Sequence, residues 1–422
     1  MISSHLAPPL SADKNQKEAV PARAMDSPKL SRLTQMNKCV QNRSDLSNFT
    51  MLYPVLFKLS SGIIIMTIKQ GRIDLHHHLV PPAYQEAIYS KGMERHAGAL
   101  LPKWTPEKSI DVMDMNGIQR AVTSISTPGV HLGNGVRPAL ALARACNEYA
   151  ATMRDDYPER FGNFAVLPMP FTEAACNEAI YSLDVLKAEG VVLFGSTDGF
   201  FLGDPRFDEL MSELDDRSAV VFVHPNLHKS SEQLGFKTPG FLIEFLCDTT
   251  RGAVNLIVNG TLEKYPRIRW LLAHGGGFLP YVAWRVSLFN ATPQLQEKLP
   301  HGMLSYIRRF YFDTALSPSS YSMAALKQLV EPEHILFGSD FPFAPAPVTS
   351  LQCQTLDENP LWSADELYAI NRGNALRLFA QYQRAGEVTQ ASPIYEEESL
   401  SSRIKRGLTK PMAALAERMR DR

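Results

Sequence analysis

Three consecutive histidines, His76, His77 and His78, follow the short stretch 72–75, which reads as a buried strand. Side chains alternate between the two faces of a strand, so His76 and His78 are expected to point one way and His77 the other. Two imidazoles side by side at a strand end can form half of a divalent-metal site. We interpret His77 as a bystander. The preceding Asp74 is expected on the face opposite to His76 and His78, as a structural or supporting carboxylate. The rest of the chain must supply the other ligands.

Three further histidine and aspartate residues each end an apolar run: His224 after residues 219–223, His274 after residues 268–273, and Asp340 after residues 335–339. Imidazole nitrogens and carboxylate oxygens are natural ligands of Zn²⁺ and similar ions. Each residue alone has an ordinary explanation, such as a hydrogen-bonded structural histidine for His224 or a turn-capping carboxylate for Asp340. Their shared position at strand ends favours one common site.

Apolar runs and helical patterns alternate from residue 67 onward. The predicted strands cover residues 73–75, 121–126, 164–167, 191–194, 219–223, 268–273, 310–314 and 335–339. The predicted helices cover residues 107–116, 137–157, 172–188, 205–217, 240–259, 279–289, 319–330 and 363–380. Continuous apolar strands indicate a sheet that is covered on both faces.

Eight strand–helix units most simply close into a (β/α)8 barrel of the TIM type, whose chemistry lies at the C-terminal ends of the strands. A doubly wound open sheet is the alternative, but it would usually carry a glycine-rich turn after an early strand, and this sequence has none. We assign residues 67–382 to the barrel. Residues 1–66 are predicted to be a disordered extension and residues 383–422 a polar tail without a catalytic role.

The composition excludes several classes of partner. The chain is 45% hydrophobic and 21% charged, with a net charge of −1, so it offers no basic field for nucleic acid. An anionic substrate must then be held by a local charge such as a metal ion. The apolar stretch 51–66 is interrupted by Pro54 and Lys58, so we expect no membrane span. Five dispersed cysteines argue against a disulfide scaffold and fit the cytosol.

Four short motifs resemble those of the amidohydrolase superfamily. They are DLHHH at 74–78, FVHP at 222–225, AHGGG at 273–277 and GSDFP at 338–342. More narrowly, they resemble the branch that contains aminocarboxymuconate-semialdehyde decarboxylase and the salicylate-type decarboxylases. The sequence IDLHHHLVPP, which begins at Ile73, resembles the 6-methylsalicylate decarboxylases of fungal polyketide pathways. The resemblance extends over residues 70–380.

The resemblance implies a set of metal ligands, namely His76, His78, His224 and Asp340. It also implies that His274 is the catalytic histidine beside the metal. Many amidohydrolases with two metals carry a bridging lysine at the end of strand four, where this chain reads VVLFG at 191–195, so a single metal is expected. Histidine ligands favour Zn²⁺, with Mn²⁺ as the alternative. Homodimers are usual in this branch.

The expected reaction is non-oxidative decarboxylation of an ortho-hydroxy aromatic acid, with 6-methylsalicylate giving 3-methylphenol and CO₂. Asp340 is the candidate proton donor, and a metal-bound water is the alternative. His274 is expected to hold substrate or water and to stabilise developing charge. Phe341 and Phe343 are candidates to line the aromatic slot, although ordinary packing explains them equally well.

Three alternatives remain open at this point. The same ligands can serve a metal-dependent hydrolase of a lactone or an amide. A decarboxylase can also act on aminocarboxymuconate semialdehyde or γ-resorcylate. A barrel that only binds or regulates is the non-enzyme alternative, against which the presence of His274 beside a full ligand set argues.

Overall fold

The structure, a computed structural model, describes residues 55–59, 62–66, 71–235, 237–291 and 297–384. The chain divides into two units, Met1–Thr67 and Ile68–Arg422. In the first unit, β1 (Val55–Leu59) and β2 (Gly62–Met66) pair as an antiparallel hairpin. This hairpin lies inside the extension for which the sequence predicts disorder. The rest of that extension, and residues 385–422 of the predicted tail, lie outside the described residues.

The second unit is built on eight parallel strands that follow one another around the sheet in chain order. They are β3 (Arg72–His78), β6 (Ile118–Ser124), β7 (Phe161–Val166), β8 (Gly190–Phe194), β11 (Val220–His224), β12 (Arg269–Leu272), β13 (Tyr311–Asp313) and β14 (Ile335–Leu336). The first and last strands also meet, because Leu75 N donates to Phe337 O at 2.9 Å and His78 N to Phe341 O at 2.7 Å. The sheet therefore closes, which confirms the predicted barrel and excludes the open doubly wound sheet.

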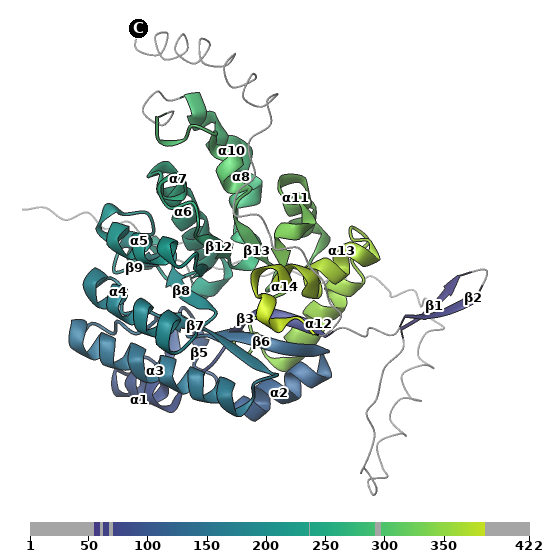
Figure 1. Cartoon of the computed structure of the whole chain (residues 1–422), viewed down its shortest axis with the longest axis horizontal. Coiled ribbons are helices and arrows are strands. Elements are labelled where there is room, and N and C mark those ends of the chain that lie inside the picture. The colour runs from purple at the N-terminus through teal and green to yellow at the C-terminus, as the bar shows by residue number, and fades with distance from the viewer. Residues whose placement is uncertain (1–54, 60–61, 67–70, 236, 292–296, 385–422) are drawn as a thin grey trace, which may run out of the picture. The chain divides into compact units, whose positions relative to one another are not determined.

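Helices surround the strands (Figure 1). They are α1 (Pro82–Ser90), α2 (Pro106–Met115), α3 (Val136–Asp156), α4 (Thr172–Ile180), α5 (Asp208–Asp216), α6 (Glu244–Val258), α7 (Thr261–Lys264), α8 (Leu279–Ser287), α10 (Met303–Ile307), α11 (Ser320–Leu329), α12 (Ala346–Asp357), α13 (Ala364–Tyr368) and α14 (Asn374–Leu378). Their ends follow local signals. Helix α2 begins after Thr105, whose side chain accepts from Lys108 N, and it ends before Gly117 at φ +64°.

A helix stands at each of the eight predicted positions, but two are interrupted. The helix predicted over 172–188 is α4 followed by the π-helical turn Tyr181–Val185, and the helix predicted over 363–380 is divided between α13 and α14. Helices α1, α7, α10 and α12 lie outside the predicted helices. Two hairpins were also not predicted, β4 (Arg95–His96) with β5 (Ala99–Leu100) and β9 (Ser196–Thr197) with β10 (Phe200–Phe201). Strands of two residues are too short to show a hydrophobic period.

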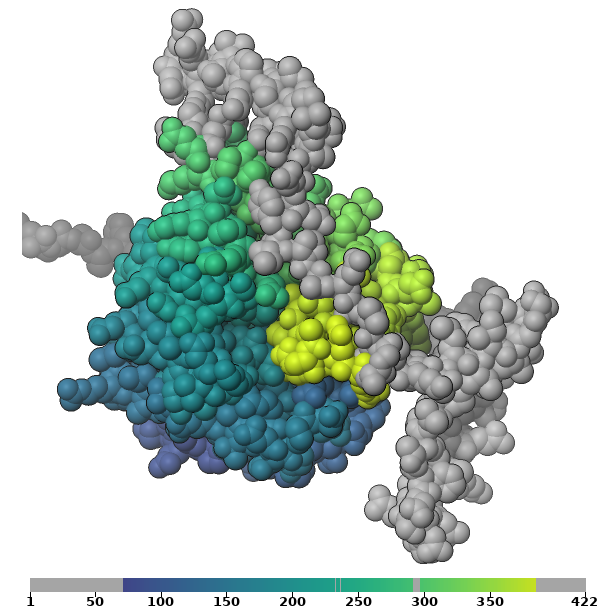
Figure 2. Space-filling model, in the orientation of Figure 1, coloured from purple at the N-terminus to yellow at the C-terminus, as the bar shows by residue number. Residues whose placement is uncertain are grey.

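Burial on both faces of the sheet explains why apolar and polar residues do not alternate along the strands. Consecutive residues of β8, Val191, Val192 and Leu193, are all at most 1% exposed, since one face of the barrel sheet meets the interior and the other meets the helices. Figure 2 shows the yellow surface of the C-terminal part of the barrel beside the blue surface of its first part. The first strand and helix α12 are linked directly, because the Arg72 guanidinium donates to both carboxylate oxygens of Asp357, at 2.6 and 2.5 Å. In the described part of the chain, no helix is long and apolar enough to cross a membrane.

Candidate functional site

Four buried side chains converge at the C-terminal mouth of the barrel. They are His76 and His78 of β3, His224 at the end of β11, and Asp340 after β14. Ligand atoms of these four lie within 4.8 Å of one another. His78 Nε2 lies 3.2 Å from His76 Nε2 and 3.1 Å from Asp340 Oδ1. The structure thus brings together all four residues that the sequence analysis names as metal ligands.

Hydrogen bonds fix the orientation of the three imidazoles. Each Nδ1 has a partner: Asp313 Oδ2 at 2.7 Å for His76, Ser124 O at 3.1 Å for His78, and Pro225 O at 2.8 Å for His224. A carbonyl oxygen can only accept, so Nδ1 of His78 and of His224 carries the hydrogen and Nε2 is left with a lone pair. Metal-binding histidines show the same arrangement, with the second nitrogen held by a carboxylate or carbonyl. The donor set fits one divalent cation.

Electrostatics in the cluster also favour a cation. Burial lowers the pKa of His76, but Asp313 and Asp340 outweigh it and raise that pKa to about 10. Burial lowers the pKa of His78, and burial together with His78 and His76 holds the pKa of His224 well below its usual range. Burial opposes ionisation of Asp340, yet His76 and His78 keep its pKa well below its usual range. A proton on His76 therefore competes with a metal ion for the same nitrogen.

His274 lies beside the ligand cluster in the turn after β12. Its backbone N donates to Asp313 Oδ1 at 2.8 Å, and its Nδ1 lies 3.1 Å from Ala315 O, which can only accept. Burial, followed by the charge of His76, lowers the pKa of His274. The ring is therefore neutral, with Nε2 as an acceptor. The backbone of His274 stands at φ +55°, a conformation that non-glycine residues rarely adopt and that is common at functional sites.

Asp313, at the end of β13, lies in the site but is not among the residues that the sequence analysis names. Its Oδ2 bonds the His76 ring, and its Oδ1 accepts from the backbone N of His274 and, at 3.0 Å, of Ala315. One carboxylate therefore orients both a candidate ligand and the histidine beside it. The available signal was the same one that identified Asp340, namely an acidic residue closing an apolar strand.

His77 points away from the cluster, as strand alternation predicts. Its Nδ1 lies 3.0 Å from Asp74 Oδ2 and its Nε2 lies 2.9 Å from Ser109 Oγ, so both ring nitrogens are satisfied in the core. Strict alternation would place Asp74 on the face of His76. A register irregularity between Asp74 and His77 instead turns this carboxylate to the other side, where Ser339 N donates to it at 3.0 Å.

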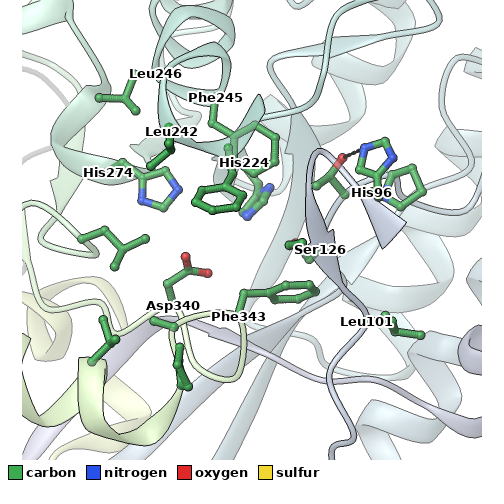
Figure 3. A pocket seen from close by; sticks show the side chains of 18 of the residues that line it. His96, Leu101, Ser126, His224, Leu242, Phe245, Leu246, His274, Asp340 and Phe343 are labelled. Atoms are coloured by element: carbon green, nitrogen blue, oxygen red, sulfur yellow. Dashed lines mark hydrogen bonds between the residues drawn. The ribbon is translucent and has the colours of Figure 1, made fainter. Parts of the chain in front are cut away.

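A cavity of about 530 Å³ opens over His224, His274 and Asp340. Figure 3 shows these side chains around a common space with Phe245 and Phe343. The Phe343 ring packs edge-to-face on His78, with 5.3 Å between ring centroids. Phe341 is buried 5.2 Å from the His77 ring and does not line the cavity. Of the two aromatic candidates, only Phe343 reaches the site.

Comparison with known proteins assigns the family. The sequence model of the amidohydrolase family matches residues 73–381. The chain belongs to this family. It is 36% identical to decarboxylase yanB of Aspergillus niger over 330 residues, which cover 75% of this chain and 89% of that protein. It is also 36% identical to 6-methylsalicylic acid decarboxylase of Penicillium expansum over 282 residues, 65% of this chain and 86% of that protein.

Solved structures share the fold. A dihydroxybenzoic acid decarboxylase from Polaromonas sp. JS666, with bound manganese and the inhibitor 2-nitroresorcinol, matches with a TM-score of 0.65. The match covers 75% of this chain and 98% of that one at 22% sequence identity. The chain therefore has the same barrel fold as these solved structures. The family match confirms the resemblance that was inferred from the four sequence motifs.

Proposed function

We propose that this protein is a metal-dependent decarboxylase of an ortho-hydroxy aromatic acid, and that it converts 6-methylsalicylate to 3-methylphenol and CO₂. The observation that carries the proposal is the buried cluster of three oriented imidazoles and one carboxylate, with His274 held beside it by its bond to Ala315 O. The similarity to 6-methylsalicylic acid decarboxylase of Penicillium expansum supports the choice of substrate.

The metal-binding residues in this proposal are the four members of the cluster, His76, His78, His224 and Asp340. Three imidazole nitrogens favour Zn²⁺, and Mn²⁺ is the alternative. When bound, the ion supplies a positive charge for the substrate's carboxylate and neighbouring hydroxyl oxygen. Asp313 contributes to metal binding indirectly, because its hydrogen bond fixes the orientation of the His76 ring.

Asp340 moves the proton. Since His76 and His78 keep its pKa low, Asp340 is ionised before substrate binds. It takes the phenolic proton on binding and then gives that proton to the ring carbon that bears the carboxylate. The bond to the carboxylate breaks, its electron pair restores the aromatic ring, and CO₂ leaves. Solvent returns a proton to the phenolate oxygen.

His274 holds the substrate in place for this transfer. Its Nδ1 is committed to Ala315 O and its backbone N to Asp313, so only Nε2 is available to substrate or to water. As a neutral ring, it accepts a hydrogen bond there from a water molecule, and this water donates to the carboxylate or phenolate oxygen of the substrate. Phe343, packed on His78, supplies an apolar face for the substrate ring.

The proposal is tested by assaying metal-loaded protein on salicylate, 6-methylsalicylate, γ-resorcylate and orsellinate, with CO₂ and the phenol both quantified. We expect release of CO₂, with the highest kcat/KM on 6-methylsalicylate. A simple aryl lactone and an amide serve as controls. Hydrolysis of either compound, with no CO₂ from any acid, would show that the cluster activates water instead. Elemental analysis of the purified protein decides between zinc and manganese.

We also propose a homodimer in the cytosol. Helix α8 and the turn after it present an exposed apolar face at Tyr281, Trp284, Leu288 and Phe289, with Tyr281 87% and Trp284 73% exposed. An apolar face of this kind typically marks a contact between proteins. Sedimentation of the native protein, compared with Trp284→Glu, tests the dimer.

The four cysteines among the described residues are all free, which fits a reducing compartment such as the cytosol.

A further inference from the structure

The cavity over the cluster is larger than a small phenolic acid requires. Its volume is about 530 Å³. An engineered protein cavity of about 150 Å³ is enough to hold benzene, so a ring acid with about twice as many atoms fills roughly 300 Å³. The remaining space is continuous with the space over His224, His274 and Asp340. It is large enough to hold a further part of the same ligand.

The lining of the cavity selects the chemistry of that part of the ligand. Among the described residues that line it, none is a lysine or arginine, and the only acidic group besides Asp340 is the exposed Glu94. The polar side chains of His96 and Thr127 bond each other at 3.0 Å, the dashed contact in Figure 3. Most of the remaining lining is apolar, for example Leu101 and Phe245. A second carboxylate on the ligand would have no lysine or arginine to pair with in this wall, whereas a hydrocarbon substituent would pack on apolar side chains.

Apolar side chains on the cavity wall are also left partly uncovered. Phe241 is 37% exposed, Leu242 51% and Leu316 48%, although all three line the cavity. Phe241 and Leu242 precede α6, and Leu316 follows β13, so two separate segments present this surface. Large apolar groups gathered around a cavity and exposed to solvent are typical of a groove that a ligand covers.

The backbone of Leu316 is also unusual. It stands at φ +53°, which a leucine side chain disfavours strongly. Gln352 of α12 holds it there, because its Oε1 accepts from Leu316 N at 2.5 Å while its Nε2 donates to Ser339 O at 2.9 Å. A glycine would adopt this conformation without strain. The strained backbone therefore presents an apolar side chain to the cavity at a cost in stability.

Resting on the proposed function, we infer that the site also takes 6-alkylsalicylates whose apolar substituent is longer than the methyl of 6-methylsalicylate, and that Leu316 is a specificity-determining residue that contacts this substituent. The metal cluster and His274 hold the carboxylate and hydroxyl end. The substituent extends along the apolar wall and covers Phe241, Leu242 and Leu316.

The test measures kcat/KM of the metal-loaded enzyme on 6-methyl-, 6-propyl- and 6-pentylsalicylate. We expect kcat/KM to rise about two- to fourfold for each added methylene that reaches the wall. Leu316→Asn, which tolerates positive φ, is expected to reduce the pentyl-to-methyl ratio of kcat/KM about fivefold. Leu316→Gly should do the same without a lower melting temperature, since it removes the strain.

The matched control is Leu100→Asn. Leu100 is 59% exposed on β5, beside the cavity but outside its lining, so this change should leave the ratio as in the native enzyme. Calorimetric binding of the 3-alkylphenol products should give the same order without turnover. If CO₂ is released but kcat/KM falls beyond methyl, or if Leu316→Asn does not alter the ratio, the inference alone is wrong. If no salicylate is decarboxylated, the proposed function fails as well.

Discussion

The two faces of strand β3 carry the same residue type in opposite circumstances. His76 and His78 each have one nitrogen held by an acceptor and the other directed at the ligand cluster. His77, between them, has both nitrogens satisfied, by Asp74 and by Ser109. All three rings are fully buried, so burial does not distinguish them. A candidate ligand is recognised by the nitrogen that its hydrogen bonds leave available.

Each face also has its own carboxylate. Asp313 bonds the ring of His76, and Asp74 bonds the ring of His77. Asp313 is shared with the backbone of His274, whereas Asp74 is shared with Ser339. Comparable pairs therefore orient a site on one face and hold the strand ends together on the other. Because each face has its own histidine–aspartate pair, substitutions can separate the role in the site from the role in the core.

The largest expected difference lies between His76→Ala and His77→Ala. We expect His76→Ala to lose the bound metal and at least about a hundredfold in kcat/KM, because even residues behind a ligand typically contribute 10- to 100-fold. His77→Ala should retain stoichiometric metal. Metal content of the purified variants, measured with activity, checks both. Metal lost from His77→Ala and kept by His76→Ala would reverse the assignment of the two faces.

The two carboxylates should differ in the next-largest effect. Asp313→Asn is expected to weaken metal binding about 10- to 100-fold, since the amide no longer fixes the His76 ring as an anion does. Asp74→Asn should leave metal affinity within about twofold and instead lower the free energy of unfolding by about 1–3 kcal/mol, because buried hydrogen bonds to its carboxylate are lost. Metal titration and urea unfolding of each variant measure the two quantities. Equal metal affinities in the two variants would contradict the comparison.

The pH dependence of metal binding should report the charge on His76. Its pKa is raised to about 10, so binding at neutral pH must release its proton, and affinity is expected to rise about tenfold per pH unit below that value. The stability of the metal-free protein should change in the opposite direction. Protonated His76 makes its full contribution to the free energy of unfolding below its unfolded pKa of about 6.5. This contribution is lost as pH rises toward 10. A metal affinity that does not vary between pH 6 and 9 would contradict this assignment.

The smallest effect is expected on the structural face. Ser109→Ala removes the partner of His77 Nε2 and also the acceptor of the Trp104 indole N–H. We expect a loss of about 1–3 kcal/mol in the free energy of unfolding and no change in metal content or in kcat. Chemical denaturation together with elemental analysis tests this. A change in metal content would show that the two faces of β3 are coupled.

Much of the fold was predictable because it depends on local pattern. The eight non-alternating apolar runs identified the barrel strands, and each predicted helix position is occupied by a helix. The hairpin β4–β5 was not predictable, since two-residue strands carry no period. That hairpin and its flanks contribute Met93, His96 and Leu101 to the cavity, so this part of the cavity wall was the least accessible from sequence.

The sequence by itself determined which residues end the strands and which face of β3 carries His76 and His78, because strand alternation and strand termini are local properties. Only the tertiary structure showed the register irregularity that turns Asp74 toward His77, and the bonds by which Asp313 serves both His76 and His274. It alone placed Phe343 at the cavity and Phe341 in the core. These outcomes depend on a register irregularity and on contacts between segments far apart in the chain, which no short window of sequence contains.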